Sequence, residues 1–274
     1  MERPSVSSVV ESQSFLRWAG SKRQLLPILS SYWCPGFRRY VEPFAGSACL
    51  FFAIRPHRAM LGDINPELIS TYTEVKYRLA GILRILETLP NDRATYLLLR
   101  SWSSEGLSPS EKAARFIYLN RYCFNGLYRT NSSGQFNVPY GGVRSGRLPV
   151  ESAFRECSRT LKAARLVRAD FQGTLSRTES GDFVYMDPPF AVRGKRVFNE
   201  YAPVSFSIDD LRRLRVWMET LQSKRIRFVV SYADSEEADL LVKGFDYRTV
   251  VVRRNIAGFT ASRRLASEVL VFNS

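Results

Sequence analysis

The sequence of 274 residues predicts an α/β protein built on a doubly wound, mostly parallel sheet, with a mostly helical module inserted into it. Short apolar segments of strand character alternate with amphipathic segments over residues 39–70 and again over residues 160–274, which favours parallel strands with crossover helices. Residues 71–159 instead have the pattern of helices and turns. Charged residues follow several of the apolar segments, at the position where open α/β sheets bind ligands.

The first strands are expected at residues 39–44 and 58–62. The first segment runs into Ala45-Gly46-Ser47, which indicates a strand, a turn and then a helix. The second ends at Asp63 and is followed by Asn65-Pro66-Glu67, a helix start with asparagine as the N-cap and proline in the first turn.

Alternation resumes after the module. Strands are expected at residues 165–171, 183–187, 226–232, 247–252 and 268–272. A helix is expected at residues 208–221, with Ser207 and Asp210 as a cap pair, and a short one begins at Ser235.

Within residues 71–159, Ser108-Pro109-Ser110-Glu111 predicts a capped helix start, and residues 125–146 are rich in turns. Residues 1–14 are expected to form a mobile tail, because they have no sustained apolar stretch of the kind a secretory signal needs.

The net charge of +14, from 40 Lys and Arg against 26 Asp and Glu, favours a polyanionic partner. Nucleic acid is the first partner to consider, although a solvated basic surface would carry the same charge. The longest apolar run, Ala48 to Ile54, is far shorter than the roughly 18 residues of a membrane span. We therefore expect a soluble, cytoplasmic protein with no membrane partner.

The cysteines do not form a recognisable metal-binding or disulfide pattern. Cys34, Cys49, Cys123 and Cys157 include no Cys-x-x-Cys pair, and His57 is the single histidine. We expect four reduced thiols, no metal, and a surface position for His57.

The tetrapeptide Asp187-Pro188-Pro189-Phe190 follows an apolar strand candidate. The exocyclic amine of adenine is a poor nucleophile, because its lone pair is delocalised into the ring. An Asp187 oxygen and the Pro188 carbonyl are acceptors that would orient such an amine toward an electrophilic methyl group, while Phe190 stacks on the base. The alternative is a strand-terminating turn with an incidental aspartate.

Two other motifs suggest a nucleotide-like ligand. Gly46 would let the backbone approach a ligand at a helix start, and Asp63 lies where a carboxylate accepts hydrogen bonds from ribose hydroxyls. Trp18 would cover a cofactor ring, and Lys22 would pair with a carboxylate. Each residue alone is also compatible with ordinary packing.

Taken together, Phe15-Leu-Arg-Trp-Ala-Gly-Ser-Lys22, Pro43-Phe-Ala-Gly46, Asp63-Ile-Asn65 and Asp187-Pro-Pro-Phe190 stand in the order typical of Dam-type, D12-class DNA adenine methyltransferases. The chain resembles this family from about Phe15 to Phe272, and residues 121–141 are similar to its DNA-reading β-hairpin. The resemblance implies a Rossmann-like methyltransferase sheet in an S-adenosylmethionine-dependent catalytic domain, residues 15–70 and 160–274. It also implies an inserted target-recognition domain, residues 71–159.

The resemblance implies that a methyl group passes from S-adenosylmethionine to N6 of a flipped-out adenine in double-stranded DNA. The implied catalytic residues are Asp187, Pro188, Pro189 and Phe190. The implied cofactor-binding residues are Trp18, Lys22, Gly46, Asp63, Phe171 and Asp187.

The resemblance further implies that Arg129 reads a guanine, that Asn125 enters the gap left by the flipped base, and that Pro139 contacts a base edge. Arg17, where a lysine is usual, would also reach a base. The implied site is GATC-like. Turn-rich segments near the hairpin and the Asp-Pro-Pro turn supply expected phosphate contacts, namely Arg144, Arg147, Arg193, Lys195 and Arg196. Phe198 and Tyr201 match aromatics that close over the base, or else belong to the core.

Two residues depart from the family pattern: Ser21 replaces the usual second glycine of the first motif, and Phe190 replaces a tyrosine. A cytosine-C5 methyltransferase needs a Pro-Cys turn, whereas Cys34 precedes Pro35. An N4-cytosine methyltransferase and a catalytically weak DNA-binding protein on the same fold remain open. So does a functional pairing with a restriction endonuclease, while a monomer is expected in solution.

Overall fold

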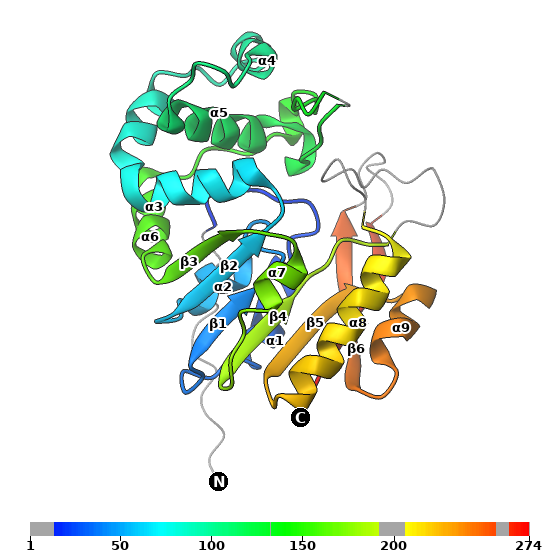
Figure 1. Cartoon of the computed structure of the whole chain (residues 1–274). Helices are drawn as coiled ribbons and strands as arrows, with labels where there is room; N and C mark the ends of the chain where they lie inside the picture. Colours follow the sequence, from blue (N-terminus) through cyan, green and yellow to red (C-terminus); the bar gives the residue numbers. More distant parts are fainter. Residues whose placement is uncertain (1–13, 132, 192–205, 256–262, 274) are drawn as a thin grey trace.

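The computed structural model describes residues 14–131, 133–191, 206–255 and 263–273, and it confirms the mixed α/β class (Figure 1). In these residues the strands form one seven-stranded sheet in the order β3-β2-β1-β4-β5-β7-β6. Their bounds are β1 Arg39–Glu42, β2 Ala59–Asp63, β3 Ala164–Arg168, β4 Asp182–Met186, β5 Arg227–Ala233, β6 Asp246–Asn255 and β7 Arg263–Phe272. Strands β1 to β5 are parallel, and β7 runs antiparallel between β5 and β6.

Helices cover both faces of the sheet, as the doubly wound prediction requires (Figure 1). The helices are α1 Leu26–Ser30, α2 Cys49–Ile54, α3 Pro66–Glu87, α4 Arg93–Ser101, α5 Pro109–Tyr122, α6 Glu151–Leu161, α7 Phe171–Leu175, α8 Ile208–Ser223 and α9 Asp239–Val242. Short 3-10 turns are η1 Arg23–Leu25, η2 Phe124–Gly126, η3 Gly142–Arg144 and η4 Glu236–Ala238.

Side chains of the strands point alternately to the two faces of the sheet, and a hydrophobic core lies on each face. In β4, Phe183 and Tyr185 point into the cluster shared with α1, α2 and α3, while Val184 and Met186 point into the cluster shared with α7, α8 and α9. Because successive strand residues face opposite sides, a central strand buried on both faces is apolar throughout. This explains the unbroken apolar segment before Asp187.

Local capping fixes the helix starts that the sequence predicts. Asn65 accepts a hydrogen bond from the Leu68 amide at 3.1 Å. Ser108 heads a capping box on α5, and Ser207 forms another with Asp210 on α8. Proline falls in the first turn of α1, α3 and α5.

Helices α3 to α6 come between β2 and β3 in the chain, and α4 and α5 lie beyond the carboxyl ends of the parallel strands (Figure 1). The expected hairpin is present as two isolated antiparallel bridges, Cys123 with Tyr140 and Thr130 with Phe136, rather than as continuous strands. The side chain of Asn131 accepts hydrogen bonds from the amides of Ser133 and Gln135. These two amides are therefore not available for a regular ladder of hydrogen bonds between two strands.

Several boundaries differ from expectation. Strand β7 begins at Arg263, five residues before the expected start at residue 268, and β6 continues to Asn255, beyond the expected end at residue 252. Strand β3 ends at Arg168 instead of continuing to Phe171, because Asp170 caps α7 by accepting from the Gly173 amide at 2.8 Å. Ser14 was expected in the tail, yet it is 5% exposed and its hydroxyl donates to the Ser47 carbonyl at 2.6 Å. His57 is exposed, as expected.

Within the described residues, no helix is both long and apolar enough to span a bilayer. The four cysteines are free thiols.

Close packing of α7 on β2 depends on Gly62. A Cβ on Gly62 would lie 2.1 Å from Oγ1 of the fully buried Thr174. We expect Gly62→Ala to lower the free energy of unfolding by roughly 1–3 kcal/mol, because overpacking forces the helix outward. Urea denaturation measures this loss, and adding Thr174→Ala should recover part of it. Equal urea midpoints for Gly62→Ala and the parent would contradict this packing.

Candidate functional site

The centre of the sheet contains the point where the strand order reverses. Strand β1 lies beside β4, and the chain leaves them toward opposite edges of the sheet. Ligands bind at the carboxyl ends of strands at such a point. Glu42 is the last residue of β1, and Asp187 directly follows β4. The two carboxyl groups therefore flank the expected crevice.

An ion pair between Lys22 and Asp187 lies at these strand ends. Lys22 Nζ lies 2.9 Å from Asp187 Oδ1 and 3.5 Å from Glu268 Oε2. The side chains of Lys22 and Glu268 are 5% and 6% exposed, whereas that of Asp187 is 22% exposed. Three segments distant in sequence thus meet at one ammonium group.

The two oxygens of the Asp187 carboxylate have different surroundings. Oδ1 accepts from Lys22 and from the Ser231 hydroxyl at 3.1 Å, and Ser231 is in turn hydrogen-bonded to the Tyr185 hydroxyl at 3.0 Å. Among the described residues, no side chain or amide donates to Oδ2. Burial raises the pKa of Asp187, and the nearby Lys22 opposes the rise. The carboxylate is therefore held through Oδ1, whereas Oδ2 accepts no hydrogen bond from the described residues.

Glu42 is a third carboxyl group at the centre of the sheet. It is 2% exposed and accepts a hydrogen bond from the Tyr40 hydroxyl at 2.8 Å. Burial raises the pKa of Glu42 well above its ordinary value, and the charges of Asp187 and Asp63 raise it further. Glu42 is thus close enough to feel the charges of both Asp187 and Asp63, the carboxyl groups of the two predicted halves of the site.

Gly46 and Asp63 form the second half. Gly46 has φ +44° and donates its amide to Asp63 Oδ2 at 3.0 Å, while Asp63 Oδ1 accepts from the Asn65 amide at 2.9 Å. Trp18 covers Gly46 so closely that an added Cβ would lie 3.0 Å from the indole Cδ1. The Trp18 ring also stacks on Tyr128, with ring centroids 5.7 Å apart.

Phe171 and Phe190 lie on the other side of the sheet from Trp18, in the cluster with α8. Phe171 is 4% exposed and stacks on Phe44 with centroids 5.4 Å apart. Phe190 packs edge to face against Tyr232, and Lys22 Nζ lies 5.7 Å from its ring centroid. Pro188 is buried and Pro189 is half-buried.

Arg17 joins the first motif to the hairpin region. Its amide donates to Asn120 Oδ1 at 2.9 Å, and Asn120 Nδ2 returns a bond to the Arg17 carbonyl at 2.6 Å. Arg17 Nη1 reaches the carbonyls of Arg121 and Arg144 at 3.4 and 3.2 Å. The guanidinium is thus engaged with the backbone in this structure, so a base contact by Arg17 stays a prediction.

Arg129 presents a different arrangement. Its Nε donates to Asn137 Oδ1 at 2.8 Å, and its two terminal nitrogens have no hydrogen-bond partner within the described part of the chain. One bond therefore fixes the stem of the fork and leaves its two-pronged end available.

The remaining predicted DNA contacts lie nearby in the same segment. Asn125 has φ +54°, and the Pro139 carbonyl accepts from the Phe124 amide at 3.0 Å. The Arg144 guanidinium lies over the Phe124 ring at 5.2 Å, and Arg147 is exposed. Arg193, Lys195, Arg196, Phe198 and Tyr201 lie outside the described residues.

Comparison with known proteins settles the family. The family described as D12 class N6 adenine-specific DNA methyltransferase matches residues 18–256. The chain belongs to this family. It is 33% identical to the type II methyltransferase M1.LlaDCHI of Lactococcus lactis subsp. cremoris, with 96% of each chain covered. It is 30% identical to the retron Ec67 DNA adenine methylase of Escherichia coli (94% of this chain, 90% of the relative) and 28% identical to the DNA adenine methylase of Haemophilus influenzae (98% and 96%).

The structure explains why this methyltransferase accommodates Ser21. The Ser21 amide bonds to the Trp18 carbonyl at 3.0 Å, which closes a turn with φ +81° at Gly20. Glycine is needed at residue 20, whereas the described positive-φ residues do not include Ser21. Serine at this position therefore costs the turn nothing.

The sequence patterns missed four residues that shape the site of this adenine-specific DNA methyltransferase. Glu42 directly precedes the Pro43-Phe-Ala-Gly46 motif, but its burial was not evident from the sequence. Ser231 and Glu268 lie on later strands, and Asn137 lies eight residues from the Arg129 side chain that it holds. In the described residues, no group of three or more His, Cys, Asp or Glu forms a metal-binding cluster.

Glu42 makes a testable contribution to the pH dependence of stability. Below about pH 4.3, where a free glutamate ionises, both folded and unfolded states hold the proton. The pKa of Glu42 is higher in the folded state, so above about pH 4.3 the folded state binds more protons than the unfolded state. The free energy of unfolding therefore falls as pH rises from the unfolded-state pKa to the folded-state pKa. Glu42→Gln should remove this loss.

We expect the Gln variant to gain stability over the parent as pH rises from about 4 toward neutral, by about 1.4 kcal/mol for each unit of pKa elevation. Urea denaturation at a series of pH values measures it, with exposed Glu87→Gln as the control. Parallel profiles for Glu42→Gln and the parent would show that the buried carboxyl group ionises normally.

Proposed function

We propose that this enzyme transfers the methyl group of S-adenosylmethionine to N6 of an adenine flipped out of double-stranded DNA. The observation that carries the proposal is the Asp187 carboxylate, held through Oδ1 by Lys22 and Ser231 at the strand reversal with Oδ2 free of described donors. A fixed acceptor beside a crevice is what a weakly nucleophilic amine needs for orientation.

The residues of the second half fit the cofactor. Each Asp63 oxygen accepts one backbone amide and retains a lone pair for a ribose hydroxyl. Gly46 and Trp18 form one wall, and Phe171 lines the pocket from the opposite core. When bound, S-adenosylmethionine supplies an already activated methyl group, so the chain needs no metal to generate an electrophile.

The protein's own part in the transfer is positioning. Asp187 Oδ2 and the Pro188 carbonyl accept the two N6 hydrogens, which directs the nitrogen lone pair at the methyl group. Phe190, steadied by the edge of Tyr232, stacks on the base. The loss of the usual tyrosine hydroxyl leaves this stacking surface in place. An N4-cytosine amine would use the same acceptors, so the modified base must be identified directly.

We assign DNA recognition to residues 71–159, inserted between the catalytic segments at residues 15–70 and 160–274. The free end of Arg129 suits the O6 and N7 atoms of guanine in a GATC-like site. Asn125 would fill the gap left by the base, Pro139 and Arg17 would contact base edges, and Arg144 and Arg147 would bind phosphates. We take the acting unit to be a monomer in the cytoplasm. The type II name of the Lactococcus relative is what favours pairing with a restriction endonuclease.

Asp187→Asn tests the acceptor. Lys22 and Ser231 both donate toward Oδ1, so the new amide would turn its oxygen to them and present its NH2 group to the substrate amine. We expect kcat to fall on the order of 10²- to 10³-fold with the fold retained. Methyl incorporation into duplex DNA measures the rate, exposed Asp209→Asn is the control, and mass spectrometry of the product nucleosides distinguishes adenine from cytosine. A near-parental rate for Asp187→Asn would refute the assigned role.

Arg129→Ala tests base reading against phosphate binding. We expect a loss of roughly 1–3 kcal/mol confined to one guanine position, measured as kcat/KM on duplexes that each differ at one base pair. Arg147→Ala should weaken binding to every duplex alike and make the salt dependence shallower by about one unit. A common factor for all duplexes with Arg129→Ala would make that residue a backbone contact.

A further inference from the structure

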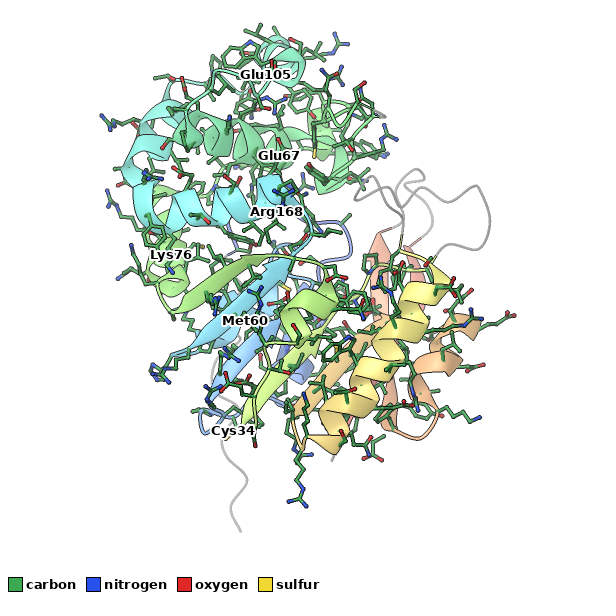
Figure 2. The ribbon with its side chains drawn as sticks, viewed as in Figure 1. Cys34, Met60, Glu67, Lys76, Glu105 and Arg168 are labelled. Carbon is green, nitrogen blue, oxygen red and sulfur yellow. The ribbon has the colours of Figure 1, made fainter. Side chains whose placement is uncertain are left out.

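Basic side chains line two adjoining depressions at the free edge of the sheet, which we call the edge groove. The first, of about 260 Å³, is lined by Arg38, Arg39, Arg58, Ala59, Ala163 and Arg165. The second, of about 450 Å³, shares Ala163 and Arg165 with the first and adds Thr73, Lys76, Tyr77, Lys162, Ala164 and Leu166. Strand β3 is the edge strand here, and Lys76 lies on the outer side of the molecule beside it (Figure 2).

The edge groove is distinct from the methyl-transfer site. Arg39 begins β1, Arg58 precedes β2, and Arg165 is the second residue of β3, so the first depression lies at the amino ends of these strands. Asp187 follows the carboxyl end of β4, at the other end of the sheet. A five-residue strand spans about 17 Å, so the groove lies outside the catalytic crevice.

The charge of the edge groove is largely uncompensated. None of the residues that line it is acidic. Arg38 and Arg39 are neutralised by Glu179 and Asp182. Arg58, Arg165 and Lys162 have no carboxylate within ion-pair distance among the described residues. Three cations without acidic partners among the described residues thus line the two adjoining depressions, Arg58 the first, Lys162 the second and Arg165 both, and their positive potentials add.

The second depression adds an exposed aromatic ring between two ammonium groups. The Tyr77 side chain is 62% exposed, with Lys76 Nζ and Lys162 Nζ at 4.9 and 4.8 Å from its ring centroid. Lys76 Nζ also donates to the Ala164 carbonyl of the edge strand at 2.8 Å. A lysine on this carbonyl obstructs the addition of another β-strand, so the edge is suited to an anion and not to a pairing peptide. Lysine, arginine and tyrosine are among the residues that contact nucleic-acid phosphates.

We propose that the edge groove binds the phosphodiester backbone of a second segment of duplex DNA, apart from the segment being methylated. The proposal goes beyond the proposed function and rests on it only in taking duplex DNA as the substrate. Backbone contact requires no base sequence, and the enzyme's own substrate offers such a backbone wherever two DNA segments come close. The groove would then keep the enzyme on long DNA between successive targets.

The test compares a duplex just long enough for one target with one several times longer. We expect Arg58→Gln/Arg165→Gln to leave kcat/KM on the short duplex unchanged. On the long duplex it should weaken binding several-fold and make the salt dependence of binding shallower by about two units, because two fewer counterions are released. The matched control is Lys224→Gln/Lys243→Gln, which removes two exposed charges from the α8 and α9 side of the molecule.

If the two double variants weakened binding to the long duplex equally, the effect would come from the total surface charge and not from the edge groove, and the proposal would be overturned. An equal loss on short and long duplexes would place Arg58 and Arg165 on the catalytic DNA path and also overturn it. Binding of single-stranded RNA is the third comparison. If RNA bound the parent but not the groove variant, while duplex DNA bound both equally, the groove would be an RNA site and the proposal would be overturned. Methylation of the short duplex by the parent tests the proposed function separately, so either idea can fail alone.

Discussion

The ion pair between Lys22 and Asp187 is the constraint around which the site is arranged. Removing two charges from water costs more than their attraction returns unless other polar groups complete the arrangement. Here Ser231 donates to Asp187, while Glu268 and the Gly20 carbonyl lie beside the Lys22 ammonium. Such a pair is weak evidence for stability, but it fixes the direction of a carboxylate. The desolvation cost of the pair is therefore matched by a benefit in orientation: the Asp187 carboxylate is held in one direction.

Four of the described residues named at the site carry carboxyl groups, and the Lys22 ammonium group pairs with two of them. Glu42, Asp63 and Asp187 lie at the carboxyl ends of parallel strands and Glu268 lies beside Lys22, whereas the chain as a whole carries a charge of +14. Among the described residues, these carboxyl groups thus gather at the carboxyl ends of the central strands in a chain that is basic as a whole. A methyl donor that bears a sulfonium charge suits these carboxyl groups, and a polyanion suits the basic chain. The two proposed ligands are separated by sign of charge as well as by position.

The sequence predicted those features that depend on neighbouring residues. Asn65, Ser108 and Ser207 cap the helices they were expected to cap, because each bond joins residues three apart. Strand ends were similarly marked by Asp63 and Asp187. The insertion of β7 between β5 and β6 was not predictable, since it depends on pairing across the fold. Apolar periodicity describes one segment at a time and carries no information about its partner.

The same limit applies inside the site. Lys22 was expected to meet a carboxylate, but Asp187 stands 165 positions later and Glu268 later still, so neither spacing nor composition selects them. The contact between Ser231 and Asp187 also requires β5 to lie beside β4. Asn137 escaped notice because a hairpin with isolated bridges gives no alternating pattern to reveal which side chains face each other.

The first motif connects functions that its residues perform separately. Arg17 holds the carbonyls of Arg121 and Arg144, Trp18 covers Gly46 and stacks on Tyr128, and Lys22 holds Asp187. Six consecutive residues thus contact the proposed DNA-reading segment, the proposed cofactor wall and the proposed catalytic turn. A shift of the hairpin on binding DNA would act on Trp18 through Tyr128, and on Lys22 through the turn at Gly20. The proposed recognition segment and the proposed cofactor wall are therefore both in contact with one short segment.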